Sequence, residues 1–373
     1  MGTVIQPGLV SIMMPAYNAE QFIAQAIESV LAQTYQNFEL IIVNDGSTDH
    51  TPSLVLKYDD PRIRVIHQSN GGEASARNTA LRHMRGEYIA FLDADDVFLE
   101  RHIELGVAYL QNHPEYAGVY SDGFHCDTQG KRMQPLSNNR RGPFEGFIFE
   151  EIARASDVFG PPTCVTIRRA LVTRYHLEFD SDIVIGPDWD FFTQFTELGN
   201  FGYIPDHTCL YRVHQTNITL RTTLEKRRLS LARCREKVIK LDAFPKLKDE
   251  TRTAVFYDLL VNLLVGHPRR QDEITSGREF NNLPESEQAR LLRLMASKAV
   301  LNGLKGEQIH AWLRRSRELN PADRRGAIIS GLYQFNPAVC RAFLNFRERL
   351  QPGEKETSPF GRLEPSQGIA HRL

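Results

Sequence analysis

The amino-acid sequence predicts an α/β fold with a doubly wound sheet, followed by a mostly helical region. Through about the first 120 residues, short apolar runs that end in turn residues alternate with segments of helical periodicity. From about residue 222, leucine and arginine recur instead at three- to four-residue spacing. Strands that are apolar throughout favour a largely parallel sheet with helices on both faces.

The elements of the predicted sheet follow one another along the chain. Strands are expected at 9–14, 38–43, 62–66, 88–92 and 117–121, and helices at 22–31, 50–57, 73–85 and 97–112. Asn18 is the expected N-cap of the first helix. Residues 130–143 are rich in Arg, Asn, Gly and Pro and predict a loop, and 144–215 mixes short helices with β-rich pieces.

The second part of the chain is predicted to be helical at 224–240, 251–266, 284–302 and 306–317. We therefore expect a catalytic α/β domain at 1–220, a basic helical domain at 221–350 and a disordered tail at 351–373, which is polar and contains Pro and Gly.

The formal net charge of −1 hides two opposite halves. Residues 1–220 hold 16 basic and 28 acidic side chains, whereas residues 221–373 hold 29 basic and 18 acidic ones. Basic helix faces are usually just solvated, and no nucleic-acid-binding motif accompanies them. The alternative is a peripheral contact with a membrane or a lipid-linked acceptor, for which Ile328–Leu350 is the expected interfacial stretch, with Leu332, Tyr333, Phe335, Phe343, Leu344 and Phe346 followed by Arg347 and Arg349.

Several classes of protein are disfavoured. Five widely spaced cysteines support neither a disulfide framework nor a zinc knuckle, and they fit a reducing cytoplasm. The N-terminal residues lack the pattern of a signal peptide, and we expect no transmembrane helix. The sequence lacks the Gly-rich fingerprint of nicotinamide enzymes, the P-loop and the Gly-x-Ser-x-Gly elbow. The expected location is the cytoplasm, with the membrane's inner face as the site of any peripheral contact.

The strongest chemical feature is Asp93-Ala94-Asp95-Asp96, directly after the apolar run 88–92. Ligands of doubly wound sheets bind beyond the carboxyl ends of the strands. Three carboxylates this close repel one another unless a cation or a proton compensates, and oxygen ligands suit Mg²⁺ or Mn²⁺. The alternative is that Asp95 or Asp96 caps the following helix.

Other polar residues follow further predicted strands. Asp45 could accept a hydrogen bond from a nucleobase, although Asp-Gly pairs are common in turns. Gly71-Gly72 with Arg77 suits a phosphate or a base, or forms a plain turn. Asp188 and Asp190 lie beside aromatic residues that could raise a carboxyl pKa towards that of a general base, or they cap a helix. His214 is a candidate metal ligand or phosphate contact, although a lone histidine is usually structural.

Six motifs occur in order: PAYN, VNDGSTD, NGGEASARN, FLDADD, PDWD and YRVHQTN. Together they resemble the glycosyltransferase family 2 domain of the GT-A type, across about residues 9–220. The resemblance implies a GT-A-type mixed sheet and an inverting, metal-dependent transfer from a nucleotide-diphosphate sugar, with UDP expected, to a glycan or lipid-linked glycan in polysaccharide or surface-glycan synthesis.

The resemblance also implies roles for individual residues. Pro15, Ala16, Tyr17 and Asn18 would line the nucleoside pocket, Asp45 would pair with the base, Gly72 and Arg77 would border the nucleotide, and Asp93 and Ala94 would contact the donor. Asp95 and His214 would hold Mn²⁺ or Mg²⁺, and Asp188 would be the catalytic base. The family often has Glu before that Asp, whereas this chain has Pro187, so Asp190 is the second candidate.

Two other functions compete with this interpretation. A nucleotidyltransferase shares a similar architecture, but PAYN stands where its Gly-rich loop would be. A non-catalytic nucleotide-sugar-binding assembly subunit would use the helical half as its working part, and the presence of Asp93, Asp95, Asp188 and His214 weighs against it.

Overall fold

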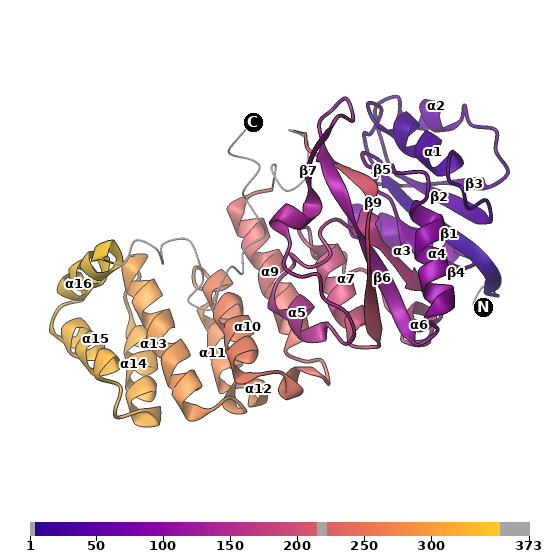
Figure 1. Cartoon of the computed structure of the whole chain (residues 1–373). Helices are drawn as coiled ribbons and strands as arrows, with labels where there is room; N and C mark the ends of the chain where they lie inside the picture. Colours follow the sequence, from indigo (N-terminus) through magenta and orange to yellow (C-terminus); the bar gives the residue numbers. More distant parts are fainter. Residues whose placement is uncertain (1–3, 215–221, 351–373) are drawn as a thin grey trace. The chain divides into compact units, whose positions relative to one another are not determined.

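The computed structural model describes residues 4–214 and 222–350, and these residues form two compact units (Figure 1). The first unit is α/β and reaches Thr223, apart from Ala153–Ala155, which belong to the second, helical unit beginning at Leu224. The expected boundary at 220/221 stays a prediction, because it falls among residues outside the described ranges. The expected tail at 351–373 lies outside them as well.

The parallel half of the sheet consists of strands β1 to β4. β1 (Gln6–Ala16) pairs in parallel with β2 (Phe38–Asp45) on one side and with β4 (Gly86–Phe91) on the other, and β2 pairs in parallel with β3 (Ile63–Gln68). Each strand overlaps one of the predicted strands, and the observed ends differ from the predicted ones by up to three residues. All eight residues of β2 are buried, as expected for a strand covered on both faces.

The other half of the sheet is mixed, so the complete sheet is not largely parallel. Its members are β5 (Val97–Phe98), β6 (Tyr116–Cys126), β7 (Arg132–Pro135), β8 (Val165–Arg168) and β9 (Asn200–Arg212). Among the described residues, nine strands form one sheet in the order β3-β2-β1-β4-β8-β6-β9-β5, with β7 paired to β6. The antiparallel strand β8 separates β4 from the parallel pair β6 and β9. The predicted GT-A-type mixed sheet is thus confirmed.

Helices flank the sheet of the α/β unit. They are α1 (Ile23–Leu31), α2 (Thr51–Val55), α3 (Glu73–His83) and α4 (His102–Asn112), followed by α5 (Phe149–Arg154), α6 (Arg169–Arg174) and α7 (Pro187–Thr196). Alternate residues of β1, such as Ile12 and Met14, share one core with α1 and α4. Because successive strand side chains point to opposite faces, α3, which packs on β1 and β2, covers the other face.

Three local predictions are wrong. Asn18 does not cap α1, because the helix begins at Ile23 after Phe22. The helix expected from residue 97 begins at His102, because Val97 and Phe98 pair with β9 as strand β5. Neither Asp95 nor Asp96 caps this helix. The expected loop 130–143 contains β7 and the 3-10 helix Leu136–Asn139.

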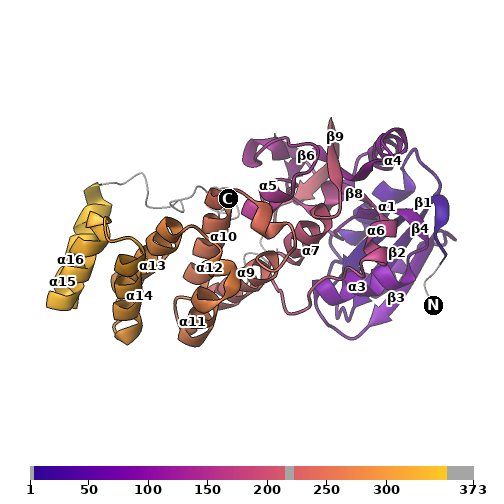
Figure 2. The same ribbon diagram turned by 90° about the horizontal axis from the view of Figure 1, so that it is seen from below.

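The second unit consists of helices (Figure 2). They are α9 (Leu224–Val238), α10 (Asp249–Asn262), α11 (Pro268–Ser276), α12 (Arg278–Asn281), α13 (Glu285–Leu301), α14 (Glu307–Leu319), α15 (Arg324–Phe335) and α16 (Pro337–Leu350). Four of them correspond to predicted helices. Within the described ranges, none of the helices combines the length and apolar character that crossing a bilayer requires.

Candidate active site

The candidate site lies where three neighbouring parallel strands end. β1 ends at Ala16, β2 at Asp45 and β4 at Phe91, and these strands are adjacent in the order β2-β1-β4. Their carboxyl ends therefore meet at one edge of the sheet. This topology brings together the three loops that carry PAYN, NDGSTD and DADD.

The loops after β1 and β2 are tied to each other by Asn18. Its backbone N–H donates to Ser47 Oγ at 3.0 Å, and its side-chain oxygen accepts from Thr48 N–H at 2.8 Å. Asn18 adopts φ 48°, a left-handed conformation that asparagine tolerates better than most residues. Pro15 is half-buried and Ala16 buried, whereas 53% of Tyr17 is exposed. An exposed aromatic ring at this edge is available for stacking on a planar ligand.

Asp45 organises the glycine loop that precedes α3. Its carboxylate accepts hydrogen bonds from Gly71 N–H at 2.9 Å, from Gly72 N–H at 2.8 Å and from Gln68 Nε2 at 2.7 Å. Gly72 has φ 84°, which glycine adopts without strain. A carboxylate offers about four acceptor positions, of which these bonds occupy three, and Asp45 is 2% exposed. The expected contact with a base stays a prediction.

Arg77 is buried between two carboxylates. It extends from α3, its side chain is 1% exposed, and it pairs with Asp93 at 2.7 Å and with Glu73 at 2.5 Å. Ala94 beside Asp93 is buried. Burying a cation is costly unless it is paired, and Asp93 and Glu73 supply that pairing. Glu73 was not among the predicted site residues, although its place four residues before Arg77 is the spacing of a helical ion pair.

The crowding of acids at this edge changes their protonation. Burial, and then the neighbouring charges of Asp93, Asp188 and Asp95, raise the pKa of Glu73 to about 7 against the lowering effect of Arg77. Burial also raises the pKa of Asp93, and it raises the pKa of Asp96 well above its ordinary value. A bound cation would relieve this repulsion.

Asp95 and His214 face each other across the sheet edge. His214 Nε2 lies 2.8 Å from Asp95 Oδ2, and the imidazole ring packs on Phe22 with ring centroids 4.9 Å apart. The two residues are 119 positions apart in sequence. A hard carboxylate oxygen and an imidazole nitrogen at one point form a donor pair suited to Mn²⁺ or Mg²⁺.

Arg212 is a functional residue that the sequence reasoning did not single out. Its side chain is fully buried and donates to the backbone oxygens of Asp95, Asp127 and Thr128 and to Gln25 Oε1, at 2.6 to 2.9 Å. Its backbone N–H donates to Asp96 Oδ1 at 2.9 Å. Arg212 therefore fixes the Asp95-Asp96 turn, and the only signal in the sequence was its place in YRVH.

The two candidate bases have different surroundings. Asp188 lies in the first turn of α7, is partly exposed, and interacts electrostatically with Glu73, Arg77 and Asp93. Asp190 is 1% exposed and accepts from Gln194 Nε2 at 3.0 Å. A general base must reach the proton that it removes. This geometry favours Asp188.

The segment before α7 is held to α3 by Asn78. The side-chain amide of Asn78 donates to Phe179 O and accepts from Phe179 N–H, both at 2.7 Å. Trp189 Nε1 donates to Ile152 O at 2.9 Å and anchors the helix itself. These contacts fix the position of α7, and so of Asp188, relative to the acids near Arg77.

Comparisons with known proteins agree with this geometry. The model of the family described as Glycosyl transferase family 2 matches residues 11–176. Residues 11–176 belong to glycosyl transferase family 2. The match covers the loops after β1, β2 and β4 and supports a glycosyltransferase.

The names of two relatives of this domain refer to different products and substrates. The chain is 46% identical over 103 residues to the Escherichia coli UDP-Glc:alpha-D-GlcNAc-diphosphoundecaprenol beta-1,3-glucosyltransferase WfgD, covering 27% of this chain and 41% of that protein. It is 33% identical to the Escherichia coli chondroitin synthase, covering 57% of this chain and 30% of that protein. The chain spans 27% to 63% of the length of three further curated relatives.

A solved structure resembles the fold over most of the chain. Staphylococcus aureus TarS 1–349, crystallised with UDP-GlcNAc, has a TM-score of 0.54 and 17% sequence identity, with 87% of this chain and 91% of that chain covered. At this identity the likeness concerns the fold alone. It supports the GT-A-type architecture of the family 2 domain.

The residues at the strand ends of the α/β unit fit a divalent cation. Asp93 and Asp95 retain 25% and 31% exposure, so their oxygens are accessible beside His214. Within the described part of the chain, no three acidic, His or Cys side chains form a ready-made cage. Mg²⁺ is commonly held by one or two carboxylates plus substrate phosphates and water, which is the arrangement that an open pair of this kind permits.

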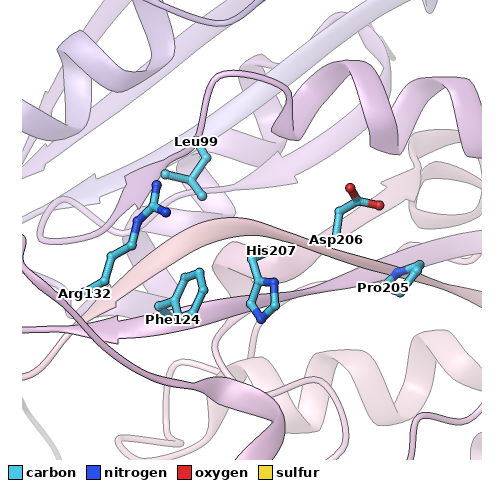
Figure 3. Close-up of a pocket in the computed structure, with 6 residues that line it drawn as sticks. All are labelled: Leu99, Phe124, Arg132, Pro205, Asp206 and His207. Atoms are coloured by element: carbon cyan, nitrogen blue, oxygen red, sulfur yellow. The ribbon is translucent and has the colours of Figure 1, made fainter.

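A pocket of about 500 Å³ lies elsewhere on the α/β unit (Figure 3). It is lined by Leu99, Phe124, Arg132, Pro205, Asp206 and His207. The His207 ring stacks on Phe124 with centroids 4.2 Å apart, and the Arg132 guanidinium lies 5.5 Å from the same ring. None of its six lining residues belongs to the predicted donor site.

Proposed function

We propose that the protein is an inverting, metal-dependent glycosyltransferase that moves a sugar from a nucleotide-diphosphate sugar to a hydroxyl of a glycan or lipid-linked glycan. One observation carries the proposal. In the α/β unit, whose residues 11–176 belong to glycosyl transferase family 2, the pair Asp95–His214 and the partly exposed Asp188 surround the same group of strand-end acids. Such an arrangement provides a site for a diphosphate leaving group and a base for the acceptor.

The donor would bind with its nucleoside over the PAYN loop. Tyr17 offers a ring face, and Asp45 offers its remaining acceptor position to the base. Asp93, whose carboxylate is held by Arg77, would face the donor's ribose. The exposed fraction of Tyr17 and the fixed loop geometry set by Asn18 support this placement.

The transfer would proceed in one displacement. Asp188 takes the proton of the acceptor hydroxyl, and the acceptor oxygen forms a bond to the anomeric carbon from the face opposite the diphosphate. The bond between that carbon and the diphosphate oxygen breaks, and its electron pair stays on the diphosphate. One displacement inverts the anomeric configuration, and a single general base suffices.

Asp95 and His214 would hold the divalent cation at the diphosphate. When bound, the cation acts as a Lewis acid that stabilises the negative charge of the leaving group. The protein's own contribution is orientation: Arg212 fixes the backbone at Asp95, and Phe22 packs against the ring of His214. Preorganised ligands need not rearrange as the charge develops.

The names of relatives suggest donor and acceptor classes. WfgD is named for a UDP-glucose donor and a diphosphoundecaprenol-linked acceptor, and chondroitin synthase for a polysaccharide product. We therefore propose a UDP-sugar as the donor and a growing glycan or lipid-linked sugar as the acceptor, in polysaccharide or surface-glycan synthesis.

The first experiment is a screen for diphosphate release. The protein is incubated with Mn²⁺, a set of nucleotide sugars and candidate acceptors, and the released nucleoside diphosphate is measured. Asp188→Asn should lower turnover by about 10²- to 10⁴-fold, because a general base contributes that much, while nucleotide binding measured by calorimetry stays intact.

Asp190→Asn is the matched control, since it makes the same change two residues away. Its turnover should exceed that of Asp188→Asn by at least tenfold. Near-normal turnover in Asp188→Asn would remove its assignment as the base. Nucleotide-sugar binding without any transfer, across the whole screen, would favour the non-catalytic assembly subunit instead.

A further inference from the structure

The end of the helical unit exposes a stripe of apolar side chains. α15 and α16 lie at one end of the row of helices, beyond α13 and α14 (Figures 1 and 2). On α16, Val339, Phe343 and Phe346 are 42%, 36% and 61% exposed, and Phe335 at the end of α15 is 82% exposed. Large apolar side chains gathered in this way mark interaction surfaces.

The stripe is separate from the face by which α16 packs on its own unit. Cys340 and Leu344 are buried, and so is Tyr333 of α15. Tyr333 and Leu344 were expected in the interfacial stretch, and this part of the prediction is wrong because both belong to the core. The exposed residues recur at positions i, i+4 and i+7, which places them within about 60° of one another around the helix.

Arginines border this stripe. An α-helix turns about 100° per residue. Measured around the axis of α16 from the centre of the stripe, Arg347 lies roughly 75° to one side and Arg349 roughly 90° to the other, whereas Arg341 lies about 170° away. Residues 324–350 contain five arginines and one glutamate. An apolar stripe between cations is the pattern of a helix that lies in a membrane interface, with its rings at the acyl boundary and its cations at the headgroups.

We propose that the α16 stripe Val339–Phe343–Phe346, together with the exposed Phe335 at the end of α15, docks on an anionic lipid surface, with Arg347 and Arg349 at the lipid phosphates. The positive charge of the arginines beside the stripe favours this partner, because basic side chains are attracted to an anionic leaflet. None of these residues belongs to the proposed catalytic site, so lipid binding can be tested independently of the proposed transfer reaction.

Sedimentation with vesicles tests the proposal on the full chain. Protein should pellet with vesicles of 30% phosphatidylglycerol in phosphatidylcholine, and much less with pure phosphatidylcholine or in high salt. Phe335→Asp/Phe346→Asp should lower the partition coefficient at least tenfold. Arg349→Gln should lower it about fivefold, the factor expected for one basic residue near an anionic leaflet.

Two controls match these changes. Val265→Asp alters another exposed apolar residue of the helical unit, and Arg341→Gln removes a charge from the far side of α16. Both should pellet like the unaltered protein, and all variants should keep its melting temperature and its diphosphate release in solution. Undiminished pelleting of the double variant would overturn the proposal. So would a dimer in sedimentation velocity that Phe346→Asp dissociates, because a second copy would then cover the stripe.

Discussion

Each unit of the molecule contains a fully buried arginine, and the two arginines differ in what they hold. Arg212 of the α/β unit donates to backbone oxygens at the Asp95 turn and in the 127–128 loop. Arg235 of the helical unit pairs with Asp258 of the neighbouring helix at 2.7 Å and donates to the backbone of Arg154. The first fixes a loop at the site, whereas the second fixes the packing of helices.

This difference indicates how buried charge is used in the two units. In the α/β unit, Arg77, Asp96 and Arg212 are at most 1% exposed, and all three lie at the strand ends beside the candidate site. Burial of a charge is expensive, and its partners must be held accurately. At the strand ends this organisation holds the loops of the candidate site in place, whereas in the helical unit it holds one helix against another.

The largest expected effect comes from removing each arginine in turn. Arg212→Met and Arg235→Met should each lower the free energy of unfolding by about 3 kcal/mol or more, because buried acceptors or a buried carboxylate lose their partner. Urea denaturation measures this loss. Only Arg212→Met should also weaken nucleoside-diphosphate binding, measured by calorimetry under conditions where both variants are folded. If Arg235→Met weakened nucleoside-diphosphate binding as much as Arg212→Met does, the two buried arginines would not differ in the way described above.

A smaller effect is expected at the proposed cation ligands. Asp95→Asn and His214→Ala should each lower Mn²⁺ affinity in the presence of nucleoside diphosphate by at least tenfold, the loss typical even of groups that only support a ligand. Titration followed by Mn²⁺ electron spin resonance gives the affinity. His207→Ala is the control, a partly exposed histidine of β9 beside the separate pocket. If His214→Ala binds Mn²⁺ like this control, His214 is not a ligand.

The sequence predicted the parallel half of the sheet well because its signals are local. An apolar run such as 38–43 can be recognised as a strand from its own residues, and the turn residues after it mark the end of the strand. Strand β5 was missed because two residues carry no periodicity, and only their pairing with Leu210 and Cys209 makes them a strand. Asn18 was expected to cap a helix, but Thr48, 30 residues away, binds its side chain instead.

The candidate site was predictable to the extent that its motifs lie at strand ends. The roles of Arg212 and Glu73 were not, because each depends on partners that the fold supplies. Arg212 meets carbonyl groups 84 and 85 residues away, and Glu73 becomes part of the site only because Arg77 also binds Asp93. Residue type and spacing do not contain such information.

The smallest expected effect concerns the protonation of Glu73, the buried acid beside Arg77 at the strand ends. Its pKa is raised from 4.5 to about 7, chiefly by burial. A carboxyl whose pKa is higher in the folded than in the unfolded state binds more protons when folded, so its contribution to stability is present below pH 4.5 and is lost as the pH rises to about 7.

Glu73→Gln retains the shape of the neutral carboxyl and removes this dependence. Because the side chain is 29% exposed, solvent screening reduces the effect, and we expect the variant to exceed the unaltered protein by about 1 kcal/mol at pH 8 and to match it near pH 4.5. Urea denaturation without metal or nucleotide gives both values, with exposed Glu100→Gln as the control. A gain of the same size at both pH values would show that the charge of Glu73 is not what destabilises the empty site. A gain confined to high pH would mean that the charged form of Glu73, disfavoured first by burial and then by the neighbouring carboxylates, destabilises the empty site.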